Sequence, residues 1–240
     1  MATIHRRTDT LPVGAILASV GGFFDAYTFL RHGVFANLQS GNVVLFCVQA
    51  TARHWHAAVV LLVPVAAFVV GVLAVEVLGV PRVGRLVRRP LRLVLTLQIA
   101  LLAMIAALPD GAPAPVTTVT VSFVAALQFS TFTTLRDAPY ATVMTSGNLR
   151  TSVVAAYQWT VGKDPAAARR AGRYAVMVGA FAVGAVVGAI CTRTVGTPAI
   201  AVAAVLLTAV LVMLVRETRR LERRRTGMEP SSSTPSPNGR

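Results

Sequence analysis

Six apolar runs, each close to the length that a helix needs to cross a lipid bilayer, constrain the fold of this chain more than any other feature. A hydrocarbon core of roughly 30 Å requires about 20 apolar residues per helical crossing. Only 13% of the residues are charged, whereas soluble domains have about a quarter. We therefore predict an all-α polytopic membrane protein with about six transmembrane helices, at Leu11–Leu30, Ala57–Gly79, Leu93–Leu108, Val116–Leu135, Tyr174–Ile190 and Ala199–Val215.

The positions of the 23 Lys and Arg residues orient these helices. Short loops on the cytoplasmic side of a membrane carry an excess of basic residues. With both termini in the cytoplasm, the strongly basic loops are all cytoplasmic, and only Arg31, Arg53 and Arg193 face outward. This arrangement requires residues 34–51 and 140–160 not to cross. It predicts a multi-pass membrane protein with both termini in the cytoplasm.

The alternative is that both of these segments cross the membrane, which gives eight helices. It places the five-arginine loop between the second and third apolar runs outside, against the positive-inside rule. It also places Asn37, Gln39 and Asn42 inside a helix within the lipid, which is costly. Because charge bias predicts orientation imperfectly, this alternative stays open.

A short motif occurs twice, as "NLQSGN" at Asn37–Asn42 and "VMTSGN" at Val143–Asn148. Gly147 follows Gly41 by 106 positions, and the same offset carries the first apolar run onto residues 117–136, which is the fourth run. Each half therefore contains one apolar run, one Ser-Gly-Asn segment and two further runs.

This order predicts two repeats, at about residues 11–108 and 116–216. The stretch Ala67–Gly71 also resembles Ala180–Gly184. Because each repeat crosses three times, the second must be inverted relative to the first, a plan found in many transporters.

The Ser-Gly-Asn segments are typical of a helix that breaks and restarts. Gly41 and Gly147 permit a sharp turn, and Asn42 and Asn148 are residues that cap the helix that follows. One interpretation is a capped helix in a surface loop. The other is a re-entrant half-helix from each repeat, with its free N–H groups directed at a central site, to which Ser40 and Ser146 also contribute.

Four further polar residues are candidates for that site. Asp25 lies well inside the first apolar run, where a carboxylate is a functional candidate, as a proton-coupling group or part of a cation site, or else a structural ion-pair partner. Its counterpart at the offset of 106 is Thr131. Gln128 lies in a Thr-rich run that either packs against other helices or lines a polar cavity. Arg150 is either buried beside Asp25 or a substrate anion, or an ordinary cytoplasmic charge.

Other functional classes lack support in the sequence. The common metalloprotease, hydrolase, P-loop and kinase motifs are absent, so we expect neither an enzyme nor a cofactor. His54 and His56 are a weak signal for metal. The basic residues lie in short loops rather than on a soluble face, which argues against a nucleic-acid partner.

The expected partners are the lipid bilayer and a small solute, with anionic headgroups at the basic loops and at the tail from Arg216. Residues 1–225 are expected to form a single transmembrane domain, and residues 226–240 a disordered tail. The sequence does not indicate an oligomeric state.

The stretches "GGFFDAYTFLRHGVFANLQSGNVVLF" and "AALQFSTFTTLRDAPYATVMTSGNLRTSV" resemble the YoaK-type family of bacterial membrane proteins, domain of unknown function 1275. The resemblance covers nearly the whole chain before the basic tail. Relatives commonly have Thr-Gly-Asn where this chain has Ser-Gly-Asn, a change that keeps a hydroxyl. The resemblance implies an integral inner-membrane protein and no particular substrate. It is carried by Gly22, Asp25, Gly41, Asn42, Gln128 and Gly147.

Together these patterns favour a small-solute transporter with a site near the middle of the membrane. That site would be lined by Asp25, Asn42, Gln128, Asn148 and Arg150. A passive channel, in which two half-helices meet without a coupling group, is one alternative. A non-transporting scaffold, in which the polar residues only hold helices together, is the other.

Overall fold

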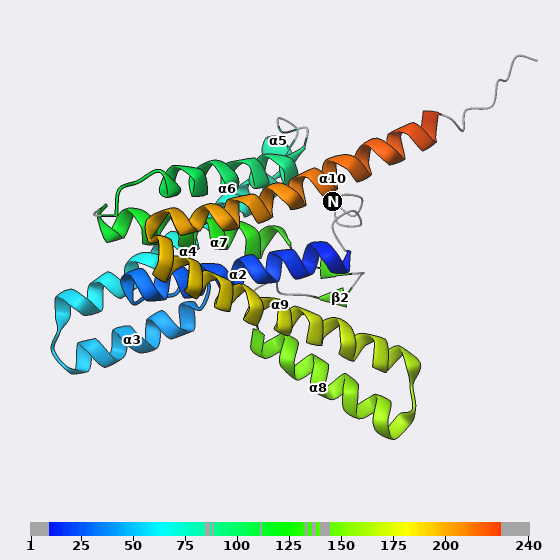
Figure 1. The fold of residues 1–240 in the computed structure, drawn as a ribbon, viewed down its shortest axis with the longest axis horizontal. Coiled ribbons are helices and arrows are strands. Elements are labelled where there is room, and N and C mark those ends of the chain that lie inside the picture. Colours follow the sequence, from blue (N-terminus) through cyan, green and yellow to red (C-terminus); the bar gives the residue numbers. More distant parts are fainter. Residues whose placement is uncertain are drawn as a thin grey trace, which may run out of the picture.

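The structure is a computed structural model, and it describes residues 10–84, 87, 89–110, 112–132, 134–135, 138–139 and 145–226. The predicted tail, beyond Thr226, and the basic residues Arg6 and Arg7 lie outside the described residues. The fold is a bundle of helices (Figure 1). The helices are α2 (Leu11–His32), α3 (Gln39–Thr51), α4 (Trp55–Gly79), α5 (Pro81–Gly84), α6 (Pro90–Ala106), α7 (Ala114–Thr131), α8 (Thr145–Gly162), α9 (Pro165–Val195), the 3-10 helix η1 (Thr197–Ile200) and α10 (Ala201–Thr226).

Five helical segments of the described chain are long and apolar enough to cross a membrane. They are α2, α4, α7, α9 and the continuous segment Thr197–Arg220 of η1 and α10. This confirms the predicted all-α, membrane-type fold. Helix α6 is apolar but has only 17 residues, or about 25 Å at 1.5 Å per residue. The sixth crossing stays a prediction.

Two hairpins contain the Ser-Gly-Asn segments. In the first, α3 has only 13 residues and turns into α4 at Arg53. In the second, α8 turns into α9 at Lys163. Arg53 (φ 61°) and Lys163 (φ 52°) are the non-glycine residues with positive φ in the described chain, so the two hairpins turn with the same unusual backbone.

The two-residue strands β1 (Thr134–Leu135) and β2 (Ala138–Pro139) pair antiparallel just after α7. Residues 140–144, which begin the second segment predicted not to cross, lie outside the described residues.

Close backbone packing joins α2 to α9 and α4 to α7. A methyl group added at Gly184 of α9 would lie 1.9 Å from the Ser19 carbonyl oxygen of α2. One added at Gly22 would lie 2.0 Å from the Phe181 carbonyl oxygen. At Gly71 of α4 it would lie 2.6 Å from the Ala126 Cβ of α7. These glycines are required because a side chain there would separate the helices.

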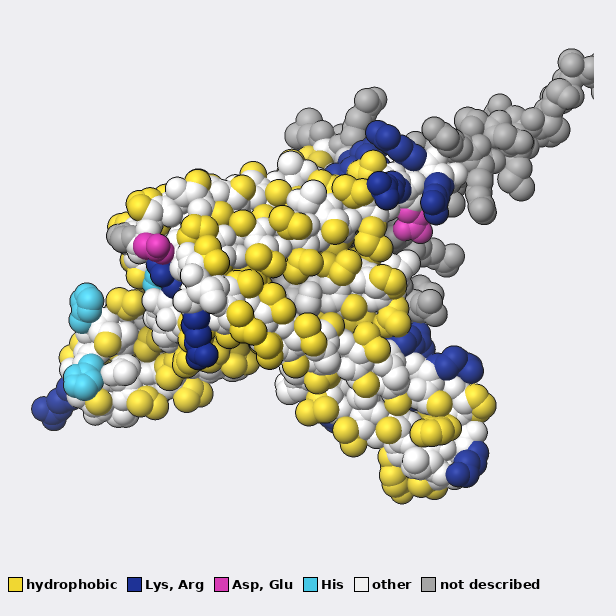
Figure 2. Space-filling view, viewed as in Figure 1, with side chains coloured by type: hydrophobic (Ala, Val, Ile, Leu, Met, Phe, Trp, Pro, Cys, Tyr) yellow, Lys and Arg dark blue, Asp and Glu magenta, His cyan; other side chains and the backbone are white. Residues whose placement is uncertain are grey.

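The apolar core lies among α2, α6, α7 and α10, where Phe23, Phe24, Leu95, Leu102 and Leu207 are fully buried. Many large apolar side chains of α4 and α9 face outward, as expected for helices that contact lipid. Hydrophobic side chains cover most of the visible flank of the bundle (Figure 2). Basic side chains gather at the end formed by the last turns of α10 and on the α8–α9 hairpin, with few at the other end.

Candidate functional site

The chain reverses direction directly after α2. Helix α2 ends at His32 and is capped by Gly33, which has φ 67° and whose N–H donates to the Phe29 carbonyl. The chain then returns along α2 until the Asn37 side-chain Nδ2 donates to the Gly21 carbonyl at 3.0 Å. Gly21 lies halfway along α2, so α3 begins beside the middle of that helix. The sharp turn that the sequence predicts at Gly41 is therefore made at Gly33, in the left-handed conformation.

The sequence predicts that Asn42 caps α3, and this prediction is wrong. The helix begins at Gln39, and the preceding residue, Leu38, provides no side-chain cap. Asn42 lies one turn into the helix and is fully buried. Its Oδ1 accepts from the Phe35 N–H at 2.9 Å, and its Nδ2 donates to the Phe35 carbonyl at 2.7 Å. Because an amide offers both a donor and an acceptor, Asn42 holds the returning segment against α3.

Gly41 and Ser40 also lie within the first turn of α3. A Cβ at Gly41 would lie 3.1 Å from side-chain atoms of Leu38 and Phe35, so the glycine allows the returning segment to pack closely. Ser40 is exposed. The first Ser-Gly-Asn segment is therefore part of a helix, and the break lies before it.

Asp25 is buried at the point where α3 begins. Its Oδ1 accepts from the Asn37 backbone N–H at 2.8 Å. The N-terminus of a helix attracts negative charge, and here a carboxylate of the same chain occupies that position. No ion pair reaches Asp25 within the described part of the chain.

Gln128 of α7 is fully buried. Its Nε2 donates to the Leu17 carbonyl of α2 at 2.8 Å. Leu17 and Gly21 are one helical turn apart, so Gln128 and Asn37 bind successive turns of the same helix. The Gln128 Oε1, the Asn37 Oδ1 and the Thr131 Oγ1 are all buried without a hydrogen-bond partner.

The second Ser-Gly-Asn segment lies in the first turn of α8. Asn148 is the fourth residue of this helix and is buried, so it does not occupy the capping position either. Ser146, Gly147 and Arg150 are exposed. The described contacts connect Gln128 to α2, and they connect both Asp25 and Asn42 to the returning segment that precedes α3. None of them connects Arg150 to Asp25.

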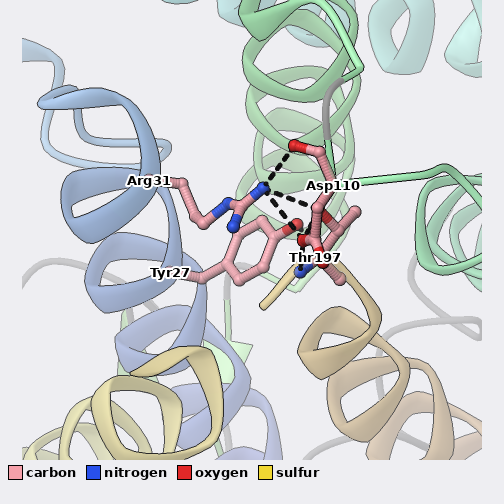
Figure 3. Close-up of polar contacts among 4 residues, drawn as sticks. All are labelled: Tyr27, Arg31, Asp110 and Thr197. Atoms are coloured by element: carbon pink, nitrogen blue, oxygen red, sulfur yellow. Dashed lines mark hydrogen bonds and ion pairs between the residues drawn. The ribbon is translucent and has the colours of Figure 1, made fainter. Parts of the chain in front are cut away.

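A polar cluster that the sequence analysis did not identify lies at the C-terminal end of α2 (Figure 3). Arg31 forms an ion pair with the Asp110 carboxylate at 3.2 Å and donates to the Thr197 hydroxyl at 2.7 Å. The Thr197 N–H and hydroxyl both donate to Asp110 at 2.8 Å. The Tyr27 hydroxyl donates to the Thr197 carbonyl at 3.2 Å. The cluster connects α2, the α6–α7 loop and η1.

The Thr197 backbone N–H is the main reason that the pKa of Asp110 lies below its usual range, and the Thr197 hydroxyl and Arg31 act in the same direction. Gly196 has φ 74°, and a Cβ there would lie 2.6 Å from the Asp110 carboxylate. The sequence predicts for Arg31 only an outward-facing charge. Its partners are 79 and 166 positions away, and no sequence pattern connects them.

One family comparison matches most of the chain. A family described as "Protein of unknown function (DUF1275)" matches residues 13–213, in agreement with the resemblance noted from the sequence. No curated protein and no solved structure matches the chain.

Proposed function

This chain belongs to the DUF1275 family of unknown function, and we propose that it is a small-solute transporter with a substrate site near the middle of the membrane, between two inverted repeats. The observation that carries the proposal is the start of α3 beside the middle of α2, with the Asp25 carboxylate at its N-terminal end. Half-helices that begin in the membrane interior form the substrate and ion sites of many transporters.

The pattern of helix packing supports two repeats. The first repeat comprises α2, α3, α4 and α6, and the second comprises α7, α8, α9 and α10. Helix α2 packs on α9, and its counterpart α7 packs on α4. Likewise α3 packs on α4 as α8 packs on α9, and α6 packs on α7 as α10 packs on α2. An exchange of the two repeats therefore reproduces each of these contacts.

Two local features support the same correspondence. Gly71 and Gly184 end the similar stretches Ala67–Gly71 and Ala180–Gly184. Each of these glycines lies against the backbone of the first helix of the other repeat, at Phe123 and Ser19 respectively. The hairpin turns at Arg53 and Lys163 share a positive φ. Such agreement is expected if the halves derive from one ancestral unit.

The arrangement of the hairpins favours inversion of the second repeat. The α3–α4 hairpin and the α8–α9 hairpin extend toward opposite ends of the bundle (Figure 1). With α6 as the sixth crossing, the basic end of the molecule faces the cytoplasm of the bacterial cell together with both termini. Anionic lipid headgroups then contact the arginines at the end of α10, from Arg216 onward, and on the α8–α9 hairpin.

In this proposal, the conformational change that transport requires takes place at the cluster around Arg31. The cluster closes the outward end by connecting α2 to η1 through Arg31, Asp110 and Thr197. Opening of that end separates these groups. The polar residues that face the solute are Asp25 and Gln128 from the centre of the bundle, with Asn148 and Arg150 from α8.

Transport is tested in two steps. A thermal-shift screen of the purified protein against small polar metabolites identifies a stabilising solute, and counterflow of that solute is then measured in proteoliposomes. We expect the wild-type protein to exchange the solute and Asp25→Asn to lose net uptake. Glu76→Gln, which removes an exposed carboxylate from α4, serves as the matched control.

The transporter, the passive channel and the scaffold give different results in these flux measurements. A passive channel keeps its flux in Asp25→Asn and shows no counterflow. If folded wild-type protein shows neither counterflow nor passive flux of any solute, the polar residues only hold helices together and the scaffold is correct.

A further inference from the structure

The α8–α9 hairpin extends beyond the apolar part of α9. Helix α9 has 31 residues, more than the about 20 that cross a bilayer, and its apolar run begins only at Tyr174. Residues 165–173 therefore continue for about 14 Å before that run, at 1.5 Å per residue. The Ser152 hydroxyl donates to the Ala171 carbonyl at 3.0 Å, and Arg170 donates to Gln158. These contacts place residues 152–162 of α8 beside the polar start of α9.

This part of α8 nevertheless has an exposed apolar face. Val153, Tyr157 and Val161 follow one another at intervals of four residues and share one side of the helix. Tyr157 is 67% exposed and Val161 is 66% exposed. The other side of α8, which includes the buried Ala155, packs on α9. Helix α8 is not among the helices that are apolar enough to cross a membrane. An exposed apolar face on such a helix indicates a surface at which something docks.

The hairpin is also strongly basic. Hydrophobic and basic side chains lie together on it, away from the rest of the bundle (Figure 2). An apolar face with aromatic residues and neighbouring Lys and Arg is typical of a helix that lies in the interface of an anionic membrane. Between residues 145 and 173 there are five basic residues and one acidic residue, which are Arg150, Lys163, Arg169, Arg170 and Arg173, and Asp164.

The direction of the hairpin keeps it close to the membrane surface. Helices α8 and α9 leave the bundle obliquely to α2 and α10 (Figure 1). The height of the hairpin above the hydrocarbon is therefore less than its length. Helix α9 runs without a break from Pro165 to Val195, so the hairpin is joined directly to a transmembrane helix.

We propose that the α8–α9 hairpin docks on the anionic cytoplasmic leaflet of the membrane through a docking face formed by Val153, Tyr157 and Val161. This face inserts at the boundary between headgroups and acyl chains, and the arginines of α9 contact lipid phosphates. Lipid is favoured over a second copy of the chain, because the basic hairpins of two copies would repel each other. The inference goes beyond the proposed transport function and does not depend on it.

The fluorescence of a single tryptophan in the docking face tests its depth. The chain has two tryptophans, Trp55 and Trp159, which are replaced by phenylalanine, and Tyr157→Trp supplies the probe. The full chain is reconstituted in vesicles of phosphatidylglycerol and phosphatidylcholine, with bromine either next to the headgroup or near the ends of the acyl chains. We expect the shallow bromine to quench the probe at position 157 more strongly than the deep bromine.

Val183→Trp in the same background is the matched control. Val183 is 61% exposed and lies in the middle of the apolar run of α9, so the deep bromine should quench it more strongly. Three results at position 157 overturn the proposal. Stronger quenching by the deep bromine places α8 in the membrane interior as a re-entrant helix. Quenching by aqueous iodide and by neither brominated lipid places the hairpin in water. Quenching by none of these agents shows that protein, such as a second copy, covers the face.

Variants of two arginines test whether the lipid must be anionic. Bromine is placed on phosphatidylglycerol alone or on phosphatidylcholine alone, at equal mole fraction, and the former should quench position 157 more strongly. Each basic residue near an anionic surface favours it by about fivefold, so Arg169→Gln combined with Arg173→Gln should remove most of this preference. Arg193→Gln, at the other end of α9, should leave it unchanged. Equal quenching by the two lipids in the chain without these variants overturns the proposal.

The outcome separates this surface from the proposed function. Shallow quenching at position 157 without counterflow of any solute supports the docking face and contradicts the transporter. Counterflow by a chain whose position 157 lies in water supports the transporter and contradicts the docking face.

Discussion

The two halves of the chain carry the same motif but different chemistry around it. At the sequence offset of 106, Asp25 corresponds to Thr131 and Gly22 corresponds to Gln128. In the first half, Gly22 admits the backbone of Phe181, and Asp25 provides a charge at the start of α3. In the second half, Gln128 contacts the backbone of the opposite helix, and Thr131 provides a neutral hydroxyl. One packing plan therefore accommodates a charge in one half and an amide in the other.

The largest effect is expected where the two halves pack most closely. Gly184→Ala places a methyl group 1.9 Å from the Ser19 carbonyl oxygen, so α2 and α9 must separate. We expect a loss of about 3 kcal/mol in the free energy of unfolding, measured by denaturant titration in detergent. Gly71→Ala, at the corresponding position of the first half, should cost less because its nearest contact is a methyl group at 2.6 Å.

Gly179→Ala is the matched control in the same helix. A Cβ at Gly179 meets nothing within 4 Å, so alanine there should stabilise α9 by up to about 1 kcal/mol through its higher helix propensity. Equal losses for the variants at positions 179 and 184 would show that the close approach of α2 and α9 is not the cause.

The second prediction concerns the structural role of Asn42. Asn42→Ala removes both hydrogen bonds to Phe35 and the one to Gln39, and leaves the Phe35 backbone groups unpaired. We expect a loss of about 2 kcal/mol, with the reversal at Gly33 opening first. Hydrogen exchange of the Phe35 amide measures this directly. Protection of that amide equal to the wild type would contradict the role given to Asn42.

Substitution of Thr131 is expected to change the free energy of unfolding less than substitution of Asp25. Thr131→Val replaces a buried hydroxyl that has no partner with a side chain of the same shape. The free energy of unfolding should change by less than about 1 kcal/mol, or rise, because no hydrogen bond is lost. A large loss of stability would indicate that the second half contains a bound group near Thr131. Thermal unfolding of Thr131→Val beside the wild type makes this comparison.

The smallest effect is expected in the cluster at the end of α2, where the pKa of Asp110 is lowered mainly by the Thr197 amide. A carboxyl group with a lowered pKa in the folded state stabilises the protein above its unfolded pKa. This contribution should be lost as the pH falls below about 4. Asp110→Asn should remove that part of the acid sensitivity, which melting curves between neutral and acidic pH would detect. An unchanged curve would contradict the assignment.

Much of the fold could be predicted from the lengths of the apolar runs, because a helix that crosses the lipid must be long and apolar. The predicted run Leu11–Leu30 matches α2, and Ala57–Gly79 matches α4 within two residues. Helix α9 begins nine residues before the predicted Tyr174. Its start is polar, but Asp164 caps it by accepting from the Ala166 N–H at 2.8 Å, and Pro165 occupies the first turn. Local capping there outweighed hydropathy.

The site was predicted only in part, because its contacts depend on chain reversal. Asp25 was identified by its charge within an apolar run. Its contact with Asn37 requires the turn at Gly33, which the sequence analysis had placed at Gly41. The partners of Arg31 come from two loops far along the chain, and no local pattern identifies them. Motifs thus indicated which residues matter, whereas tertiary packing decided what each one contacts.

The central claim, that two inverted halves each place a hairpin on its own side of the membrane, is tested most directly by labelling the hairpin tips. Single cysteines are introduced at Arg53 and Lys163 in a chain whose Cys47 and Cys191 have been replaced by serine. A membrane-impermeant maleimide is then applied to intact cells and to inverted vesicles. The account predicts that position 53 reacts in cells and position 163 in inverted vesicles. Reaction of both positions from the same side would contradict it.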